Sequence, residues 1–162
     1  MALTISLLAL LGMFYELYLQ RSHNEKSVMP LAQIVLGDIE GHIFVYVRNN
    51  GVGPLIIDRL TFTKDGKHFS NIEDCLNVAP QSYMHDVSTV ETGKKVILPN
   101  SFLAVFETKF EQQEGEEERN LVRQQLTTLA LKVYGHDVYD NKIKVERDFQ
   151  WFGRHINEKV IG

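Results

Sequence analysis

The residues best suited to chemistry lie close together in residues 135–141, whose sequence is GHDVYDN. His136, Asp137 and Asp140 carry imidazole and carboxylate groups that could ligate a metal ion or hold a water. These three residues share one turn, whereas metal ligands usually come from well-spaced, rigid positions. Asp and Asn side chains in turns also hydrogen-bond their own backbone. We therefore predict a structural turn without a metal, and a metal-dependent enzyme using these three residues is the alternative.

Elsewhere the sequence shows no signature of catalysis or of cofactor binding. Gly51 and Gly53 lie between predicted strands with no helix after them, so they do not form a phosphate-binding loop. Cys75 is the single cysteine, and we expect a small, half-buried side chain that forms no intramolecular disulfide. The net charge is −4 and the Lys and Arg residues are scattered, which argues against nucleic-acid binding. We predict no enzyme activity and no cofactor.

The elements that would position these residues are mostly short strands. Alternating apolar residues bounded by turn-forming residues predict strands at 31–39, 42–48, 55–64, 67–69, 94–98, 102–110, 129–134, 142–147 and 148–152. This spacing is typical of an antiparallel sandwich or barrel, and we predict a mainly β, immunoglobulin-like β-sandwich. One or two short helices are expected, at 116–127 and from about residue 70 through Leu76. Residues 79–92 are expected to form a long loop, and the sequence does not decide whether it binds a partner.

Three of the predicted strands show details that can be tested. In 42–48, one face carries Ile43, Val45 and Val47, and the opposite face carries His42, Phe44 and Tyr46. In 55–64 the alternation slips, which predicts a bulge near Asp58. In 102–110 we expect one shared face for Phe102, Ala104 and Phe106.

The turn between the second and third predicted strands is the best fold marker in the chain. Its residues are Asn49, Asn50, Gly51, Gly53 and Pro54. Asn and Gly tolerate positive φ, and proline fixes φ and removes a backbone donor. We therefore expect a structural turn with left-handed backbone positions. A second turn, at Asp65–Gly66, is typical of a tight hairpin.

The N-terminal segment, residues 2–19, is apolar on all sides and carries one charge, Glu16. A helix of this length rises about 27 Å, close to the thickness of the bilayer hydrocarbon. Tyr15 and Tyr18 stand at its end, where interfacial aromatics belong. A cleaved signal peptide and a buried helix are the alternatives, but a cleavage site and a polar face are both missing. We predict a transmembrane helix that binds the lipid bilayer through residues 2–19.

The rest of the chain divides into a linker, a body and a tail. We expect a polar linker at 20–30, the β-sandwich domain at 31–152 and a polar tail at 153–162. Arg21 and Lys26 follow the apolar segment, and no charged side chain precedes it. The positive-inside rule therefore places the N-terminus outside and the sandwich in the cytoplasm, with an outward-facing envelope or periplasmic module as the alternative.

Several segments together resemble a known type of protein. They are the apolar N-terminal helix, SVMPL at 27–31, VRNNGVGPLII at 47–57, VYGHDVYDN at 133–141 and DFQWFGR at 148–154. Their order resembles a group of uncharacterised bacterial single-span membrane proteins with a small immunoglobulin-like β-sandwich domain. The resemblance implies the fold and the anchor, and it implies no activity.

These features predict a membrane-anchored protein that works by binding an unknown protein partner as a scaffold, sensor or accessory subunit. Aromatic residues outside the expected core strands are candidate docking residues, namely Tyr139, Trp151 and Phe152. Packing of Trp151 and Phe152 onto the core is the competing expectation for those two residues.

Overall fold

The computed structural model describes residues 2–78, 83–84, 94–110 and 115–156. Its elements are α1 (Ala2–Ser27), β1 (Ala32–Ile39), β2 (His42–Asn49), β3 (Leu55–Lys64), β4 (Lys67–Phe69), β5 (Lys95–Ile97), β6 (Phe102–Lys109), α2 (Glu116–Thr127), β7 (Leu129–His136), β8 (Lys142–Asp148) and the 3₁₀ helix η2 (Gln150–His155).

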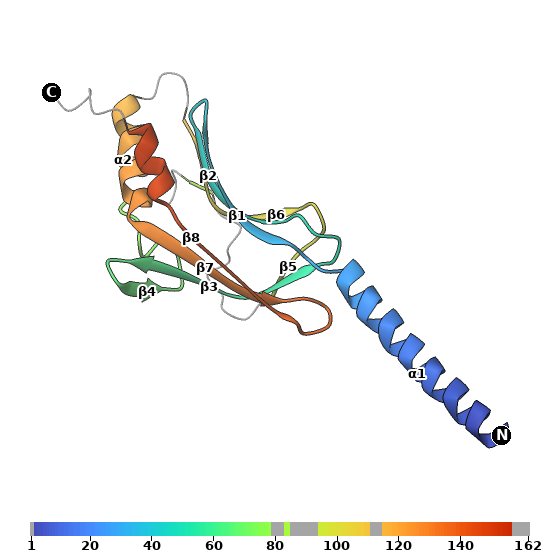
Figure 1. Ribbon diagram of the computed structural model, residues 1–162. Coiled ribbons are helices and arrows are strands. Elements are labelled where there is room, and N and C mark those ends of the chain that lie inside the picture. Colours follow the sequence, from blue (N-terminus) through green and yellow to red (C-terminus); the bar gives the residue numbers. More distant parts are fainter. Residues whose placement is uncertain (1, 79–82, 85–93, 111–114, 157–162) are drawn as a thin grey trace.

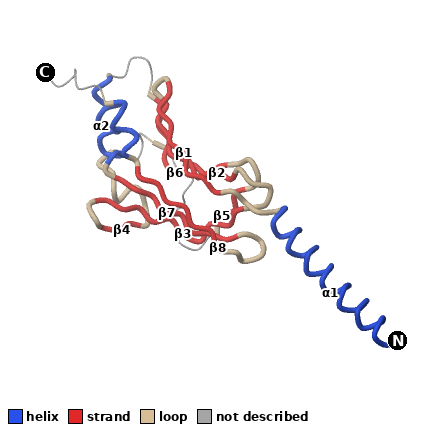
Figure 2. The backbone as a smooth tube through the Cα atoms, in the orientation of Figure 1, coloured by secondary structure: helices blue, strands red, loops and turns tan. Residues whose placement is uncertain are grey.

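The strands form two antiparallel sheets that share one core (Figures 1 and 2). The smaller sheet has the order β1-β2-β6. The larger has the order β4-β3-β7-β8, and β5 also pairs with β3. The Arg147 guanidinium donates to the carbonyl of Ile34 at 2.7 Å and so links the edge strands β8 and β1. The predicted mainly β, antiparallel architecture is confirmed, and the immunoglobulin-like assignment stays a prediction.

Alternation along the strands builds the core as the sequence predicts. On β2, the side chains of Ile43, Val45 and Val47 are fully buried, and the residues between them are not. Leu129, Leu131 and Val133 of β7 are buried in the same alternating pattern. Since successive side chains of a strand point to opposite faces, each sheet has one apolar face turned inward. Burial of these apolar faces against each other is the main force that holds the sheets together.

A buried asparagine joins the linker, the turn after β2 and the end of β5 at the end of the body nearest to α1. The Asn49 side chain accepts from the backbone N–H of Leu31 at 3.1 Å and of Gly51 at 3.0 Å. Its amide donates to the carbonyls of Gly53 at 2.7 Å and Ile97 at 3.1 Å. Asn49 is completely buried. The two hydrogen bonds that its amide donates are therefore buried, the two that its oxygen accepts are partly buried, and together they fix how the chain enters the body.

The glycines of this turn serve a different purpose from the one expected. No residue from 49 to 54 has a positive φ. A Cβ on Gly53 would lie 1.7 Å from the carbonyl oxygen of Val28, and a Cβ on Gly51 would lie 2.4 Å from that of Met29. The expectation of left-handed positions is wrong here, because the glycines are needed for close backbone approach. Left-handed residues occur instead in the predicted hairpin, at Asp65 (φ 50°) and Gly66 (φ 75°).

Two bulges shift the register between paired strands. The register of β3 against β7 shifts between Ile57 and Arg59, so the predicted bulge near Asp58 is confirmed. The register of β6 against β2 shifts between Val45 and Tyr46. This second bulge puts the completely buried Phe106 on the inner face, opposite Val45, while Phe102 pairs with Arg48 on the outer face. The prediction that Phe102 and Phe106 share a face is wrong, because an extra residue reverses the alternation.

Two predicted elements take other forms. The chain from Ser70 to Leu76 makes turns, with the N–H of Cys75 bonded to the carbonyl of Ile72 at 2.9 Å. Strand β8 ends at Asp148, whose carboxylate accepts from the N–H of Gln150 at 3.1 Å and so starts η2. The predicted strand 148–152 is therefore wrong after Asp148. The 3₁₀ turn buries both Phe149 and Phe152, which an extended strand would place on opposite faces.

Helix α1 projects from the body (Figure 1). Its large apolar side chains from Leu3 to Leu19 are all 47–86% exposed, so the alternative of a buried helix is wrong. The segment Leu3–Ser27 is long and apolar enough to cross a membrane. The helix continues through residues 20–27 of the predicted linker and ends before Pro30, as expected from the restriction that proline places on the preceding residue. Of the predicted polar tail, residues 157–162 lie outside the described residues, and Gly153, Arg154 and His155 belong to η2.

Candidate binding surface

The turn at 137–141 is held together by Asp137. This residue is 1% exposed. One oxygen of its carboxylate accepts from the backbone N–H of Tyr139 at 2.8 Å and of Asn141 at 2.9 Å. The other oxygen accepts from the Asn141 amide at 2.8 Å. Burial disfavours the charged carboxylate, but these donors outweigh it and hold the pKa of Asp137 below its ordinary value. The carboxylate is thus engaged by its own turn.

His136 turns away from Asp137 toward another strand. Its Nδ1 lies 2.9 Å from a carboxylate oxygen of Asp58, and its Nε2 lies 3.9 Å from Asp140. Lys94 Nζ stands 4.0 Å from the other Asp58 oxygen. Within the described part of the chain, no group of three or more His, Cys, Asp or Glu side chains is placed to hold a metal ion. The three predicted metal ligands are therefore not gathered into one site. Asp137 is bonded within its own turn, and His136 pairs with Asp58 of a different strand.

The three predicted docking aromatics are placed differently. Tyr139 is 44% exposed at the tip of the β7–β8 turn. Trp151 is partly buried, with ring centroids 5.3 Å from Phe152 and 4.5 Å from His155. Phe152 is completely buried, so the docking role proposed for it is wrong and it belongs to the core. Tyr139 remains available on the surface.

Cys75 is more deeply buried than expected, at 2% exposed. Burial raises the pKa of its thiol to about 11. Since the thiolate is the nucleophilic form, this thiol is unreactive near neutral pH.

The outer face of the smaller sheet carries a row of aromatic rings. Along β2 the ring of Phe44 lies 4.9 Å from His42 and 4.4 Å from Tyr46, measured between centroids. Tyr46 then stacks on Phe102 of β6 at 4.3 Å, with the planes at 21°. Phe102 is 49% exposed, and Ile39, paired with His42 on β1, is 63% exposed. We call the surface of Ile39, His42, Phe44, Tyr46 and Phe102 the aromatic face.

Gly37 of β1 makes room for this row. It pairs with Phe44, and a Cβ on Gly37 would lie 2.0 Å from the Cζ atom of that ring. The far edge of the Phe44 ring therefore occupies the volume that any other side chain would need. The ring leans across β1, and the row of aromatic rings covers more than one strand.

A carboxylate organises the polar side of the aromatic face. Glu107 accepts from the Tyr46 hydroxyl at 2.8 Å, and its other oxygen lies 3.0 Å from His42 Nε2 and 3.3 Å from Lys109 Nζ. Burial opposes its ionisation, but the Tyr46 and Lys109 hydrogen bonds and the nearby His42 lower the pKa of Glu107. Since His42 and Tyr46, on either side of Phe44 in the row, are tied to one anion, the face is pre-organised.

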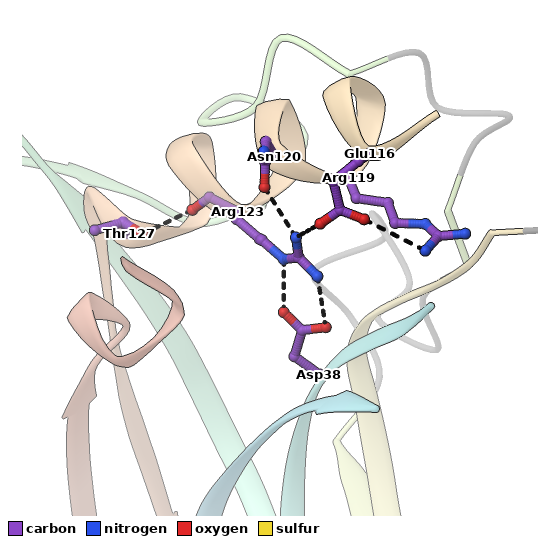
Figure 3. Close-up of polar contacts among 6 residues, drawn as sticks. All are labelled: Asp38, Glu116, Arg119, Asn120, Arg123 and Thr127. Carbon is purple, nitrogen blue, oxygen red and sulfur yellow. Dashed lines mark hydrogen bonds and ion pairs between the residues drawn. The ribbon is translucent and has the colours of Figure 1, made fainter. Parts of the chain in front are cut away.

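A second buried polar cluster lies where α2 meets β1 (Figure 3). The Arg123 guanidinium donates to Asp38 through Nε at 2.7 Å and through Nη2 at 3.2 Å. Its Nη1 bonds to Asn120 at 2.9 Å and to Glu116. The hydrogen bonds to Asp38 are the largest cause that raises the pKa of Arg123, and those to Glu116 add to it. Since Arg123 of α2 bonds to Asp38 of β1 as well as to residues of its own helix, the cluster attaches α2 to the sheet.

Three of the five residues of the aromatic face could be grouped from the sequence. The period-2 pattern placed His42, Phe44 and Tyr46 on one face. Phe102 and Glu107 could not be assigned to it, because β6 lies far away in sequence and carries a bulge. No family model matches the chain, and no curated protein is similar to it.

Proposed function

We propose that the chain is a membrane-anchored binding module, without catalytic activity of its own, that docks a protein partner on the aromatic face. The observation that carries the proposal is the stacked row from His42 to Phe102 on an outward sheet surface. Protein interfaces place aromatic side chains at the centre and polar groups at the rim. Here Glu107, Lys109 and the exposed Arg48 supply the rim.

The chemistry of the surface favours a partner that presents aliphatic or aromatic side chains. Both Glu107 oxygens are already engaged within the face, so they offer little to an incoming base. The rings of Phe44, Tyr46 and Phe102 present apolar surface whose order is already fixed. Side chains that are already fixed lose little rotamer entropy on binding, so a given buried area yields a higher affinity.

Photo-crosslinking tests the proposed surface. We expect p-benzoylphenylalanine in place of Phe102 to give a discrete protein adduct in native membranes. The matched control places the same probe at Leu121 of α2, which is 53% exposed against 49% for Phe102. The variant Ile39→Asp should remove the adduct at 102, because it sets a charge on the apolar surface. Adducts of equal yield from the probes at 102 and 121 would contradict the proposal. So would an adduct at 102 that persists in the Ile39→Asp variant.

The anchor is proposed to be α1, with the body on the cytoplasmic side. The exposed apolar side chains of Leu3–Ser27 support insertion, because water does not favour such a surface. Arg21 and Lys26 on the body side of the apolar segment support the orientation.

Thiol labelling tests the orientation. Cys75 is unsuitable as a reporter because it is buried, so a cysteine is added with the exposed-site variant Lys67→Cys. We expect an impermeant maleimide to label this variant only after the cells are permeabilised, while the unaltered chain stays unlabelled. Labelling in intact cells would instead support the outward-facing arrangement.

A further inference from the structure

The end of the body from which α1 leaves is built from a linker and three turns. The N–H of Val52 bonds to the Met29 carbonyl at 3.3 Å, so the turn after β2 lies against the linker. The N–H of Asn49 bonds to the Ser101 carbonyl at 3.0 Å, which brings in the turn before β6. Ile56 at the start of β3 pairs with His136 at the end of β7, so the β7–β8 turn lies at this end too. Figure 1 shows that turn on the same side of the body as α1.

These four segments hold most of the exposed apolar side chains of the body. Outside α1, eleven large apolar side chains among the described residues are exposed, and six of them are here. Their exposed fractions lie between 44% and 68%. We call this set the membrane-facing tips: Met29, Leu31, Val52, Leu98, Val138 and Tyr139.

We propose that the membrane-facing tips contact the headgroup region of the bilayer that α1 crosses. A hydrocarbon core about 30 Å thick takes about 20 helical residues, so about six residues at the polar end of α1 remain and rise about 9 Å. A headgroup layer is about 5–7 Å thick, and the side chains of the tips can span the small difference. The hydrogen bonds of Met29 and Leu31 fix the chain to the body directly after the helix, so the body stays close to the membrane. Tyr139 suits this depth, because tyrosine has an apolar ring and a polar hydroxyl.

The bilayer fits these tips better than a protein partner does. The apolar side chains stand on four separate segments around the exit of α1, whereas the aromatic face is one continuous row. The surface is also continuous with the proposed anchor, and the inference rests on that anchor. In the β7–β8 turn, the 95% exposed Asp140 precedes Lys142 by two residues in the sequence, so this turn carries charges of both signs and offers no basic patch. The contact should therefore form in zwitterionic lipid.

Fluorescence quenching tests the contact in the full chain, reconstituted in phosphatidylcholine vesicles. An environment-sensitive dye is attached to Val52→Cys or Val138→Cys, and quenching by headgroup nitroxide lipid is measured. The same dye on Lys67→Cys, at the end of the body away from α1, gives the reference quenching. The dye on Leu10→Cys, quenched by a nitroxide on the lipid acyl chains, tests whether α1 is inserted in the bilayer. The unaltered chain controls for dye on Cys75. We expect quenching at 52 and 138 at least about twofold above that at 67, given the thickness of the headgroup layer.

The outcomes separate the two proposals. Strong quenching at Leu10→Cys with quenching at 52 and 138 equal to that at 67 would overturn the headgroup contact and leave the anchor in place. Absence of acyl-chain quenching at Leu10→Cys would overturn the anchor itself. Adding Leu98→Ser to Val52→Cys should lower the signal at 52, whereas adding Leu121→Ser on α2 should not. Equal effects of the two serine substitutions would contradict a role for the tips.

Discussion

Replacing Arg123 by methionine is expected to lower the free energy of unfolding by about 3–5 kcal/mol, the usual cost of breaking a buried ion pair by removing one partner. The side chains of Arg123 and Asp38 are only 9% and 4% exposed. Without the guanidinium, the Asp38 carboxylate would lose both of its bonds to Arg123 in a site that water hardly reaches. Urea unfolding of the purified chain in detergent micelles measures the loss.

Two further variants show whether the loss comes from the buried pair. Lys132→Met removes the cation of a more exposed pair, Lys132 and Glu146 at 3.0 Å, and should change stability little. Adding Asp38→Leu to Arg123→Met should restore part of the stability, since no buried charge is then left without its partner. If Arg123→Met were no worse than Lys132→Met, the cluster in Figure 3 would not be what attaches α2.

The parts of the fold that the sequence predicts are those governed by neighbouring residues. The alternation of β2 and β7 reflects one buried and one outward face, which a single strand already reveals. The Asp65–Gly66 turn likewise depends on local backbone preferences. These local rules were enough to predict the antiparallel, mainly β architecture.

The errors occur where distant contacts decide the conformation. Phe149 and Phe152 are both drawn into the core, and the N–H of Phe149 bonds to the Leu129 carbonyl at 2.9 Å, so the chain turns where a strand was expected. The bulge of β6 depends on its pairing with β2, which its own sequence does not contain. The same limit applies to charged pairs such as Arg123 with Asp38, which lie 85 residues apart.

In the candidate site, too, contacts between sequence neighbours were predictable and contacts between distant residues were not. The Asp137 turn was predictable because its donors, Tyr139 and Asn141, are two and four residues away. The pairing of His136 with Asp58 spans 78 residues and required the topology. Glu107 joins the aromatic face across 61 residues from Tyr46. Sequence patterns thus grouped surface residues within one strand but could not join residues of different strands into one surface.

The two proposed surfaces are related through β2 and β6. Phe102 follows directly after the turn that bonds to Asn49, so this end of the aromatic face lies beside the membrane-facing tips. His42 and Ile39 lie at the other end of β2. A partner on the aromatic face would therefore extend from the membrane surface outward along the strands. This arrangement favours a partner that is itself at the membrane.

Asn49→Ala is expected to lower the free energy of unfolding by at least about 3 kcal/mol, since each buried group left unpaired costs about 1–3 kcal/mol. The substitution removes four hydrogen bonds, to the backbone of Leu31, Gly51, Gly53 and Ile97. Asn50→Ala is the matched control. Its side chain is exposed and bonds to Gln33, so we expect a loss of about 0.5 kcal/mol or less. Urea unfolding in detergent micelles compares the two.

Amide hydrogen exchange distinguishes this role from a simple loss of packing. The N–H groups of Leu31 and Gly51 donate to the Asn49 side-chain oxygen, so Asn49→Ala should speed their exchange more than that of core amides in β7. Asn49→Asp keeps an acceptor for both N–H groups but turns a carboxylate oxygen toward the carbonyls of Gly53 and Ile97. It should therefore destabilise the body while these two amides exchange more slowly than in Asn49→Ala. Uniform exchange changes in both variants would contradict the assignment of Asn49 as the residue that fixes how α1 joins the body.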